Sequence, residues 1–364
     1  MAAAGDKDGA AMRRAVKRLS FGASWEERAA AAAEVGRLAR SNERTKRALP
    51  ELGVVPPLLS MLVEPGKAGG GAGARMAAVR ALLELARGTH RNKVHIVKAG
   101  LLKKLPQIMA DRDLATSHDL ALLLLSVSSL ANTDFPLSST ELLPFLVSTL
   151  SINPADVPAD TRLSCLAALR NLSANLEHVR AVATSGAVRA LLALSSLDKA
   201  TAEVALGVLS DVAATSVAGR REIAEDEAAP RAMVEAVARR DSAACQEHAT
   251  YLVMALAQGS AGRELLRRMR RIGAVQALLE VSLLGSPLAR SRADKILQWF
   301  KDDGRDGIRG HSGPRTEAVD KIVKKSLDRN MRSIMRRATA SVDMTTDATT
   351  KQLVESSSSK TLPC

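Results

Sequence analysis

The clearest pattern in the chain is a set of apolar positions that follow a glycine. After Gly53, Gly100, Gly186 and Gly273, apolar side chains recur two, five, six and nine or ten residues further on, as in "SGAVRALLAL" around Gly186. This spacing places them on one face of a helix. The glycines are 47, 86 and 87 residues apart, so each of the last two intervals has room for one more copy.

Two copies that lack the glycine fill these intervals. "TELLPFLVSTL" near Glu141 and "AAPRAMVEAV" near Ala228 carry a similar apolar pattern, and the steps become 47, 41, 45, 42 and 45 residues. A longer helical pattern follows each copy, and a short one precedes most glycines. The longest step contains the Gly-rich stretch Glu64–Ala74, which we expect to be a loop. A three-helix unit of about 40–47 residues is typical of a helical solenoid, whose stacked units bury a continuous core.

The repeat unit, with "SGAVRALLAL" and "ALRNLS", resembles the armadillo repeat. The segment "SWEERAAAAAEVGRLARSNERTKRALPELGVVPPLLSML" resembles the start of armadillo domains in plant U-box and related armadillo proteins. "RADKILQWFKDDG" is similar to the tails of plant armadillo-only proteins. The resemblance covers roughly Met12 to Phe300 and is specific for the fold but not for the function.

The expected fold is all-α, a right-handed superhelical solenoid of about six armadillo repeats that follow one leading cap helix. The chain then continues into a C-terminal helix and a disordered tail. The expected boundaries are a disordered N-terminus over 1–11, the solenoid over 12–300, a linker over 301–314, a basic amphipathic helix over 315–338 and a Ser- and Thr-rich disordered tail over 339–364.

Composition narrows the class of function. The formal charge is +13, which suits anionic partners, but aromatic residues are only 2% of the chain. Nucleic-acid readers usually stack bases on aromatic side chains, so this composition argues against nucleic acid. The three cysteines are far apart and form no disulfide framework or zinc motif, so we expect a cytoplasmic or nuclear protein.

No catalytic or metal-binding motif is found. The six histidines are scattered, with no HExxH pair, and no GxSxG sequence occurs. The glycines at 69–73 lack the Gly-Lys-Ser/Thr ending of a phosphate loop. A U-box needs a compact domain of its own, and neither the residues before Ser24 nor the polar tail can hold one. We therefore expect a non-enzymatic chain without a cofactor, which does not recruit a ubiquitin-conjugating enzyme by itself.

The resemblance also directs attention to the groove along the third helices. Armadillo import receptors bind basic peptides there with a Trp and an Asn four residues later. Aligning the repeats leaves one Asn match, Asn171, and no Trp match, which argues against an import receptor. The candidate partner-binding residues of the groove are Arg80, Glu84, Asn171, Asp211, Tyr251 and Gln298. The alternative, that these side chains only solvate a helix face, stays open.

The tail segment Arg315–Ala338 has an apolar stripe at four-residue steps and a basic face. The stripe comprises Val319, Val323, Leu327, Met331 and Met335, and the basic face comprises Lys321, Lys324, Lys325, Arg329, Arg332, Arg336 and Arg337. Three interpretations stay open: a cap on the last repeat, a binding segment for a calmodulin-like partner or an anionic membrane surface, or disorder. In "RRATAS", Thr339 and Ser341 follow two arginines, a context that basophilic kinases favour.

Together these features predict a non-enzymatic protein-interaction scaffold or adaptor that binds partner segments in the armadillo groove. The resemblance implies a plant signalling or ubiquitin-linked pathway. The alternatives are a substrate-recognition component of a ubiquitin ligase acting in trans, and a membrane-surface or calmodulin-binding protein that uses its tail. We expect a monomer whose partners are other proteins, among them a ubiquitin-ligase or kinase component.

Overall fold

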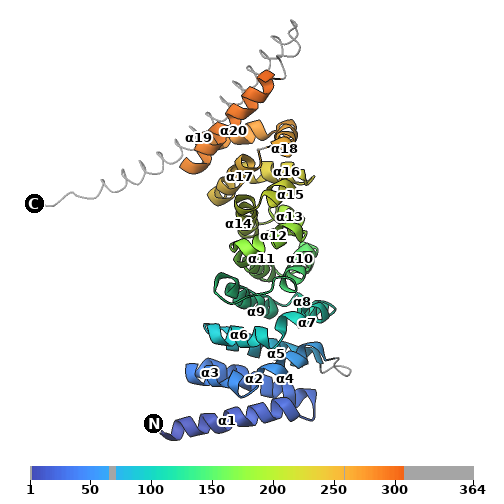
Figure 1. Ribbon diagram of the computed structural model, residues 1–364, viewed down its shortest axis with the longest axis vertical. Helices are drawn as coiled ribbons and strands as arrows, with labels where there is room; N and C mark the ends of the chain where they lie inside the picture. Colours follow the sequence, from blue (N-terminus) through green and yellow to red (C-terminus); the bar gives the residue numbers. More distant parts are fainter. Residues whose placement is uncertain (1, 65–70, 258, 307–364) are drawn as a thin grey trace, which may run out of the picture. The chain divides into compact units, whose positions relative to one another are not determined.

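The computed structural model describes residues 2–64, 71–257 and 259–306. All regular secondary structure in these residues is helical (Figure 1), which confirms the all-α prediction. The chain divides into two compact units, Met1–Ala232 and Met233–Cys364. Each unit is built from helices that follow one another in repeat order.

The first unit begins with two leading helices and continues with three-helix repeats. The leading helices are α1 (Ala2–Phe21) and α2 (Trp25–Ser41). The first two repeats contain α3 (Glu43–Glu51), α4 (Val55–Val63), α5 (Gly71–Ala86), α6 (His90–Lys98), α7 (Leu101–Ile108), the single turn α8 (Arg112–Ala115), α9 (His118–Ser128) and the 3-10 helix η1 (Ser129–Asn132). The third repeat has no first helix and contains α10 (Leu142–Ser151), the 3-10 helix η2 (Pro154–Asp156) and α11 (Ala159–Ser173). The fourth repeat contains α12 (Leu176–Thr184), α13 (Ala187–Leu194) and α14 (Lys199–Thr215).

The fifth repeat crosses the division between the units, and the sixth belongs to the second unit. The fifth contains α15 (Val217–Glu225), α16 (Ala229–Ala238) and α17 (Ala243–Leu256), with the division inside α16. The sixth contains α18 (Gly259–Arg271), α19 (Ala274–Leu284) and α20 (Pro287–Asp306).

Gly186 shows why a glycine marks the repeat in the sequence. It lies between α12 and α13 with a φ of 82°, in the left-handed region where a side chain would strain the backbone. Gly53, Gly100 and Gly273 occupy the equivalent junctions with φ angles of 83°, 98° and 95°. The two copies without the glycine need another turn, since no described non-glycine residue has a positive φ.

Within each unit, the third helices of successive repeats pack on one another, and α2 packs on the first of them. Several begin at a polar N-cap, Ser24, Ser117, Asp198 or Ser242, whose side chain accepts a backbone N–H three residues later at 3.0–3.3 Å. In the first unit α2 packs on α5, α5 on α9, α9 on α11 and α11 on α14, and in the second unit α17 packs on α20. Small and medium apolar side chains fill these contacts, so the low aromatic content matches the core.

The N-terminal prediction is wrong. Disorder is expected over 1–11 from the sequence, but α1 begins at Ala2 and runs to Phe21. Its first half is rich in alanine and has no proline, which favours a helix. Its second half buries Ala15 and Leu19, and the helix packs against α2, so a second leading helix precedes the expected one.

Two other boundaries also shift. Helix α20 continues to Asp306, so the predicted linker over 301–314 cannot begin at 301. Helix α5 begins at Gly71, inside the Gly-rich stretch that was expected to be a loop. The predicted helix over 315–338 with its basic face, and the tail over 339–364 with Thr339 and Ser341, lie outside the described residues. Among the described helices, none is long and apolar enough to cross a membrane.

Candidate functional site

The predicted groove residues all lie on third helices, but most of their polar groups contact a neighbouring helix. Arg80 and Glu84 are on α5, Asn171 is on α11 and Asp211 is on α14, in the first unit. Tyr251 and Gln298 are on α17 and α20, in the second unit.

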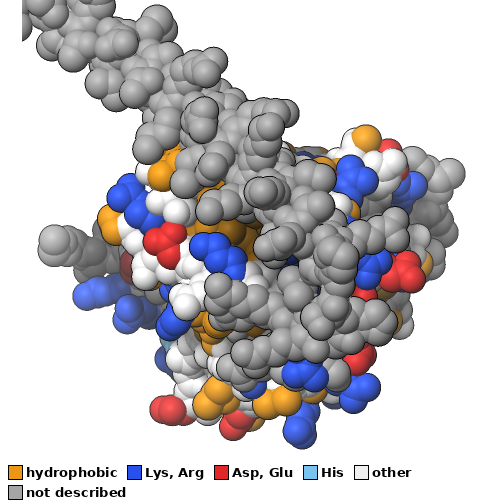
Figure 2. Space-filling model, turned by 90° about the horizontal axis from the view of Figure 1, so that it is seen from above, with side chains coloured by type: hydrophobic (Ala, Val, Ile, Leu, Met, Phe, Trp, Pro, Cys, Tyr) orange, Lys and Arg blue, Asp and Glu red, His pale blue; other side chains and the backbone are white. Residues whose placement is uncertain are grey.

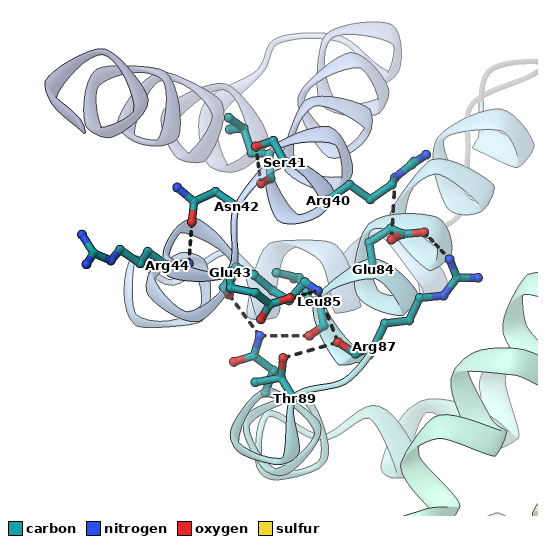
Figure 3. A network of polar contacts seen from close by, with 12 residues as sticks. Arg40, Ser41, Asn42, Glu43, Arg44, Glu84, Leu85, Arg87 and Thr89 are labelled. Carbon is teal, nitrogen blue, oxygen red and sulfur yellow. Dashed lines mark hydrogen bonds and ion pairs between the residues drawn. The ribbon is translucent and has the colours of Figure 1, made fainter. Parts of the chain in front are cut away.

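Glu84 is buried, which corrects the expectation that it is an exposed groove residue. Only 8% of the residue is exposed. Its carboxylate lies 3.6 Å from Arg40 Nε of α2 and 2.9 Å from Arg87 Nη1 (Figure 3). The sequence repeat places Glu84 on the correct helix face, but it does not reveal the two arginines that cover the carboxylate.

A network of hydrogen bonds joins the C-terminal end of α5 to α3 and α6, the first helices of two successive repeats. Arg87 accepts hydrogen bonds at its carbonyl from Lys46 Nζ (3.4 Å) and Thr89 Oγ1 (3.3 Å) (Figure 3). Asn92 of α6 is fully buried and donates Nδ2 hydrogens to the carbonyls of Lys46 (3.0 Å) and Leu85 (2.9 Å). These contacts fix one repeat on the previous one. Asn92 could not be identified from the sequence, because one of its partners, the carbonyl of Lys46, is 46 positions away.

Arg80 is exposed, as predicted, and pairs across repeats. Its Nε lies 2.8 Å from Asp119 Oδ2 in the first turn of α9. Asp119 also carries negative charge at a helix N-terminus, where the helix dipole favours it. This surface ion pair links α5 to α9. Such pairs contribute about 0–1 kcal/mol to the free energy of unfolding.

Asn171 and Asp211 are half-exposed and also reach neighbouring third helices. Asn171 Nδ2 donates to Ser128 Oγ of α9 at 2.9 Å. Asp211 Oδ2 lies 3.8 Å from Arg170 Nε of α11. The asparagine that matches the peptide-binding position of import receptors therefore uses one amide hydrogen within the solenoid.

Lys93 is a further residue that sequence reasoning missed on this face. Its Nζ donates to Ser129 Oγ at 2.8 Å, at the position that aligns with Asn171. Burial lowers the pKa of Lys93 from its ordinary value. Lys93 comes from the first helix α6, so the helical pattern of the third helices gives no sign of it.

In the second unit, Tyr251 is half-exposed and its ring lies under a cation. The guanidinium carbon of Arg292 is 5.3 Å from the ring centroid, a cation–π contact. Arg292 Nη1 also donates to the carbonyl of Glu247 at 2.9 Å. Gln298 is exposed on α20. Tyr251 and Arg292 thus join α17 to α20.

Between the polar pairs of the first unit lies a row of half-exposed apolar side chains. They share a helix face with Ser129, Asn171 and Asp211, because they precede these residues by four, seven or eight positions. The row, called here the apolar floor, comprises Leu122, Leu125, Leu163, Ala167 and Val204. Leu125 and Ala167 stand where import receptors have tryptophan, so the floor has no aromatic walls.

The groove face of the first unit presents apolar side chains and paired charges. The described residues contain no cluster of His, Cys, Asp or Glu with the geometry of a metal site. Cys165 of α11 is buried, and burial raises the pKa of its thiol to about 12, so the thiol stays protonated at neutral pH.

Comparison with solved structures finds designed armadillo proteins. A set of computationally designed armadillo repeat proteins for modular peptide recognition is 18% identical, covers 79% of this chain and 98% of its own, and has a TM-score of 0.44. An engineered protein of the Northeast Structural Genomics Consortium is 17% identical, covers 88% of both chains and has a TM-score of 0.49. A designed armadillo repeat protein in complex with the peptide (KR)4 is 16% identical, covers 79% and 98%, and has a TM-score of 0.42.

No curated protein matches the chain significantly. The family model described as "Plant U-box protein ARM repeat region" matches residues 11–307, which include all six described repeats, the leading helix α2 and part of α1. The match extends over most of the sequence and agrees with the helical repeat order. This chain therefore belongs to the family of plant U-box protein ARM repeat regions.

Proposed function

We propose that the first unit binds an apolar segment of another protein along the apolar floor, and that the chain acts as an interaction scaffold. Armadillo repeat folds generally serve as protein-interaction scaffolds. The surface used by this chain and the kind of partner it binds are what we propose here. The observation that supports it is the row of half-exposed apolar residues on α9, α11 and α14.

The neighbouring charges favour an apolar partner over a basic peptide. Arg80, Asp119, Arg170 and Asp211 already form ion pairs across repeats, so they present little unpaired negative charge. Interfaces gain most of their binding free energy from a few well-buried contacts surrounded by polar residues. A partner segment with apolar side chains at helical or alternating spacing would bury the floor and leave these pairs at the rim.

The test compares the proteins captured by the full chain and by a groove variant. Leu125→Arg/Ala167→Arg places two charges on the floor, where an apolar partner would have to bury them at a high cost. Gln107→Arg/Ala110→Arg adds the same charge at exposed positions outside the third helices and is the control. Proximity labelling in native extract should lose its specific partners with the floor variant and keep them with the control.

If the floor variant is folded and still captures the same partners, the proposal is contradicted. A chain that ends at Asp306, the last residue of α20, separates the contribution of the tail. If that chain loses the partners while the floor variant keeps them, the tail is the recognition element.

Family membership supports a second candidate, substrate recognition for a ubiquitin ligase in trans. In this case the chain would hold a substrate on its apolar floor while another protein supplies the U-box or RING domain. Addition of the chain to such a ligase should increase ubiquitination of the bound substrate, and the floor variant should not. Equal ubiquitination with and without the chain would exclude this candidate.

A further inference from the structure

The last repeat exposes the helix face that an earlier repeat buries. In the first unit, α4 packs against α7 of the next repeat, and Val55 and Leu59 are 3% and 0% exposed. The equivalent residues of α19, counted from Gly53 and Gly273, are Val275 and Leu279, and both are half-exposed. The face is equally apolar in the two helices, so the difference is the absence of a covering helix among the described residues.

The same comparison holds for the third helix. Ala74 and Leu85 of α5, which packs against α9, are 1% and 0% exposed. By the repeat alignment their equivalents in α20 are Leu288, which is 48% exposed, and Trp299, which is half-exposed. Both replacements are larger apolar side chains, although an exposed terminal helix would ordinarily carry polar ones. We call Val275, Leu279, Leu288 and Trp299 the terminal face.

A further complete repeat does not fit this face well. Ala81 of α5 is 1% exposed, but Lys295 occupies the equivalent position of α20 and is exposed. A stacked repeat would bury the ammonium group of Lys295, which is costly without a partner. A single amphipathic helix covers a narrower strip and leaves a lysine at its edge in water. On the described surface that Figure 2 shows, hydrophobic side chains and Lys and Arg side chains lie next to each other.

We propose that the terminal face is the docking surface for the chain's own segment Arg315–Ala338. Only the eight residues 307–314 separate this segment from the end of α20. An extended stretch of that length spans about 28 Å, more than the 8–10 Å between packed helices. The tether therefore permits a return onto α19 and α20, and it gives the segment an effective concentration of about millimolar.

The sequence pattern of the segment matches the terminal face. Its apolar residues from Val319 to Met335 lie four apart and would extend about 24 Å along one side of a helix. Leu288 and Trp299 are about 16 Å apart along α20 by the same rise per residue. With the apolar stripe on the terminal face, Lys321, Lys325, Arg329, Arg332 and Arg336 would point away from it and form a cationic surface.

The fluorescence of Trp299 measures whether the face is covered. The chain has two tryptophans, Trp25 and Trp299, so Trp25→Phe leaves Trp299 as the only emitter, and Trp299→Phe gives the Trp25 background. In the full chain we expect acrylamide to quench Trp299 weakly. Leu327→Asp/Met331→Asp, which breaks the apolar stripe, should increase the quenching constant severalfold and shift the emission to longer wavelength. Lys325→Ala/Arg329→Ala, on the side of the helix opposite the stripe, should change neither.

Two outcomes would overturn the inference. An equal quenching constant for Trp299 in the full chain and in the Leu327→Asp/Met331→Asp variant would show that the segment does not cover the face. If Trp299 is protected from acrylamide in both proteins and this protection is lost on dilution, a second copy of the chain covers the face. Because Leu327→Asp/Met331→Asp lies beyond α20, this variant leaves the sequence of the repeat helices unchanged. The outcome is also independent of partner binding on the apolar floor.

Discussion

Asn171 of α11 donates a side-chain hydrogen bond to Ser128 Oγ of α9, with 2.9 Å between Nδ2 and Oγ. These residues are 43 positions apart in the sequence and belong to successive third helices. In this chain, the asparagine that import receptors would use to hold a peptide instead joins two repeats. The polar residues on the groove face therefore act first in stacking, and the apolar floor between them is the surface left for a partner.

Substitution of Asn171 should lower stability. Asn171→Ala removes the hydrogen bond to Ser128, and a bond of this kind contributes about 1 kcal/mol to the free energy of unfolding. Ser128→Ala should cost a similar amount, and the double variant should cost less than the sum of the two because they share one interaction. Urea unfolding of the four proteins measures the coupling. Strict additivity would contradict the inter-repeat role of this bond.

Asn92 should be more sensitive than Asn171, because it is fully buried. Asn92→Ala leaves the carbonyls of Lys46 and Leu85 without their donor, and unsatisfied buried polar groups cost about 1–3 kcal/mol each. The matched control is Asn132→Ala at an exposed position, where the change should stay within about 0.5 kcal/mol. Equal unfolding midpoints for the two variants would show that the network in Figure 3 does not stabilise the first repeats.

Stability should fall in acid in a way that depends on Glu64. The hydrogen bond from Arg28, 2.7 Å from Nη1 to Oε2, lowers the pKa of Glu64 below its ordinary value of 4.5. A carboxylate whose pKa is lower in the folded state contributes stability above its unfolded pKa, and this contribution is lost as the pH falls through the folded pKa. Glu64→Gln should therefore be less stable than the native chain at pH 7, and the difference should disappear below the folded pKa. A difference that stays constant from pH 7 into strong acid would contradict this linkage.

Cys165 should be unreactive in the folded chain. Burial raises the pKa of its thiol to about 12, and Cys245 is also buried. The thiolate is the reactive form, so a maleimide at pH 7 should label neither residue until the chain unfolds. Mass spectrometry of labelled peptides, with and without urea, distinguishes these sites from Cys364. Rapid labelling of Cys165 without urea would show that α11 opens locally.

The repeat could be predicted from the sequence because its signals are local. Gly186 and its equivalents recur since the turn between the first two helices has a positive φ, and the apolar spacing identifies the buried face of each helix. The contacts of Glu84 could not be predicted in the same way. Arg40 is 44 positions before it, and only the packing of α5 on α2 brings the two side chains together.

The N-terminal helix α1 was missed for a different reason. Its first residues lie before the first copy of the repeat pattern, and disorder was expected over 1–11. Their alanines nevertheless favour a helix, and Leu19 anchors it by burial. Local propensity and one packed turn are sufficient to extend a helix beyond the part that a repeat search detects.

The most direct test of the interaction account is the affinity of a partner segment for the apolar floor. Once proximity labelling has identified a partner, a fluorescent peptide from its binding region can be titrated with the native chain, the Leu125→Arg/Ala167→Arg variant and the Gln107→Arg/Ala110→Arg control. The account predicts that the floor variant binds at least about tenfold more weakly, a loss of about 1.4 kcal/mol, and that the control binds like the native chain. Equal affinity for all three proteins would contradict it and place recognition elsewhere on the chain.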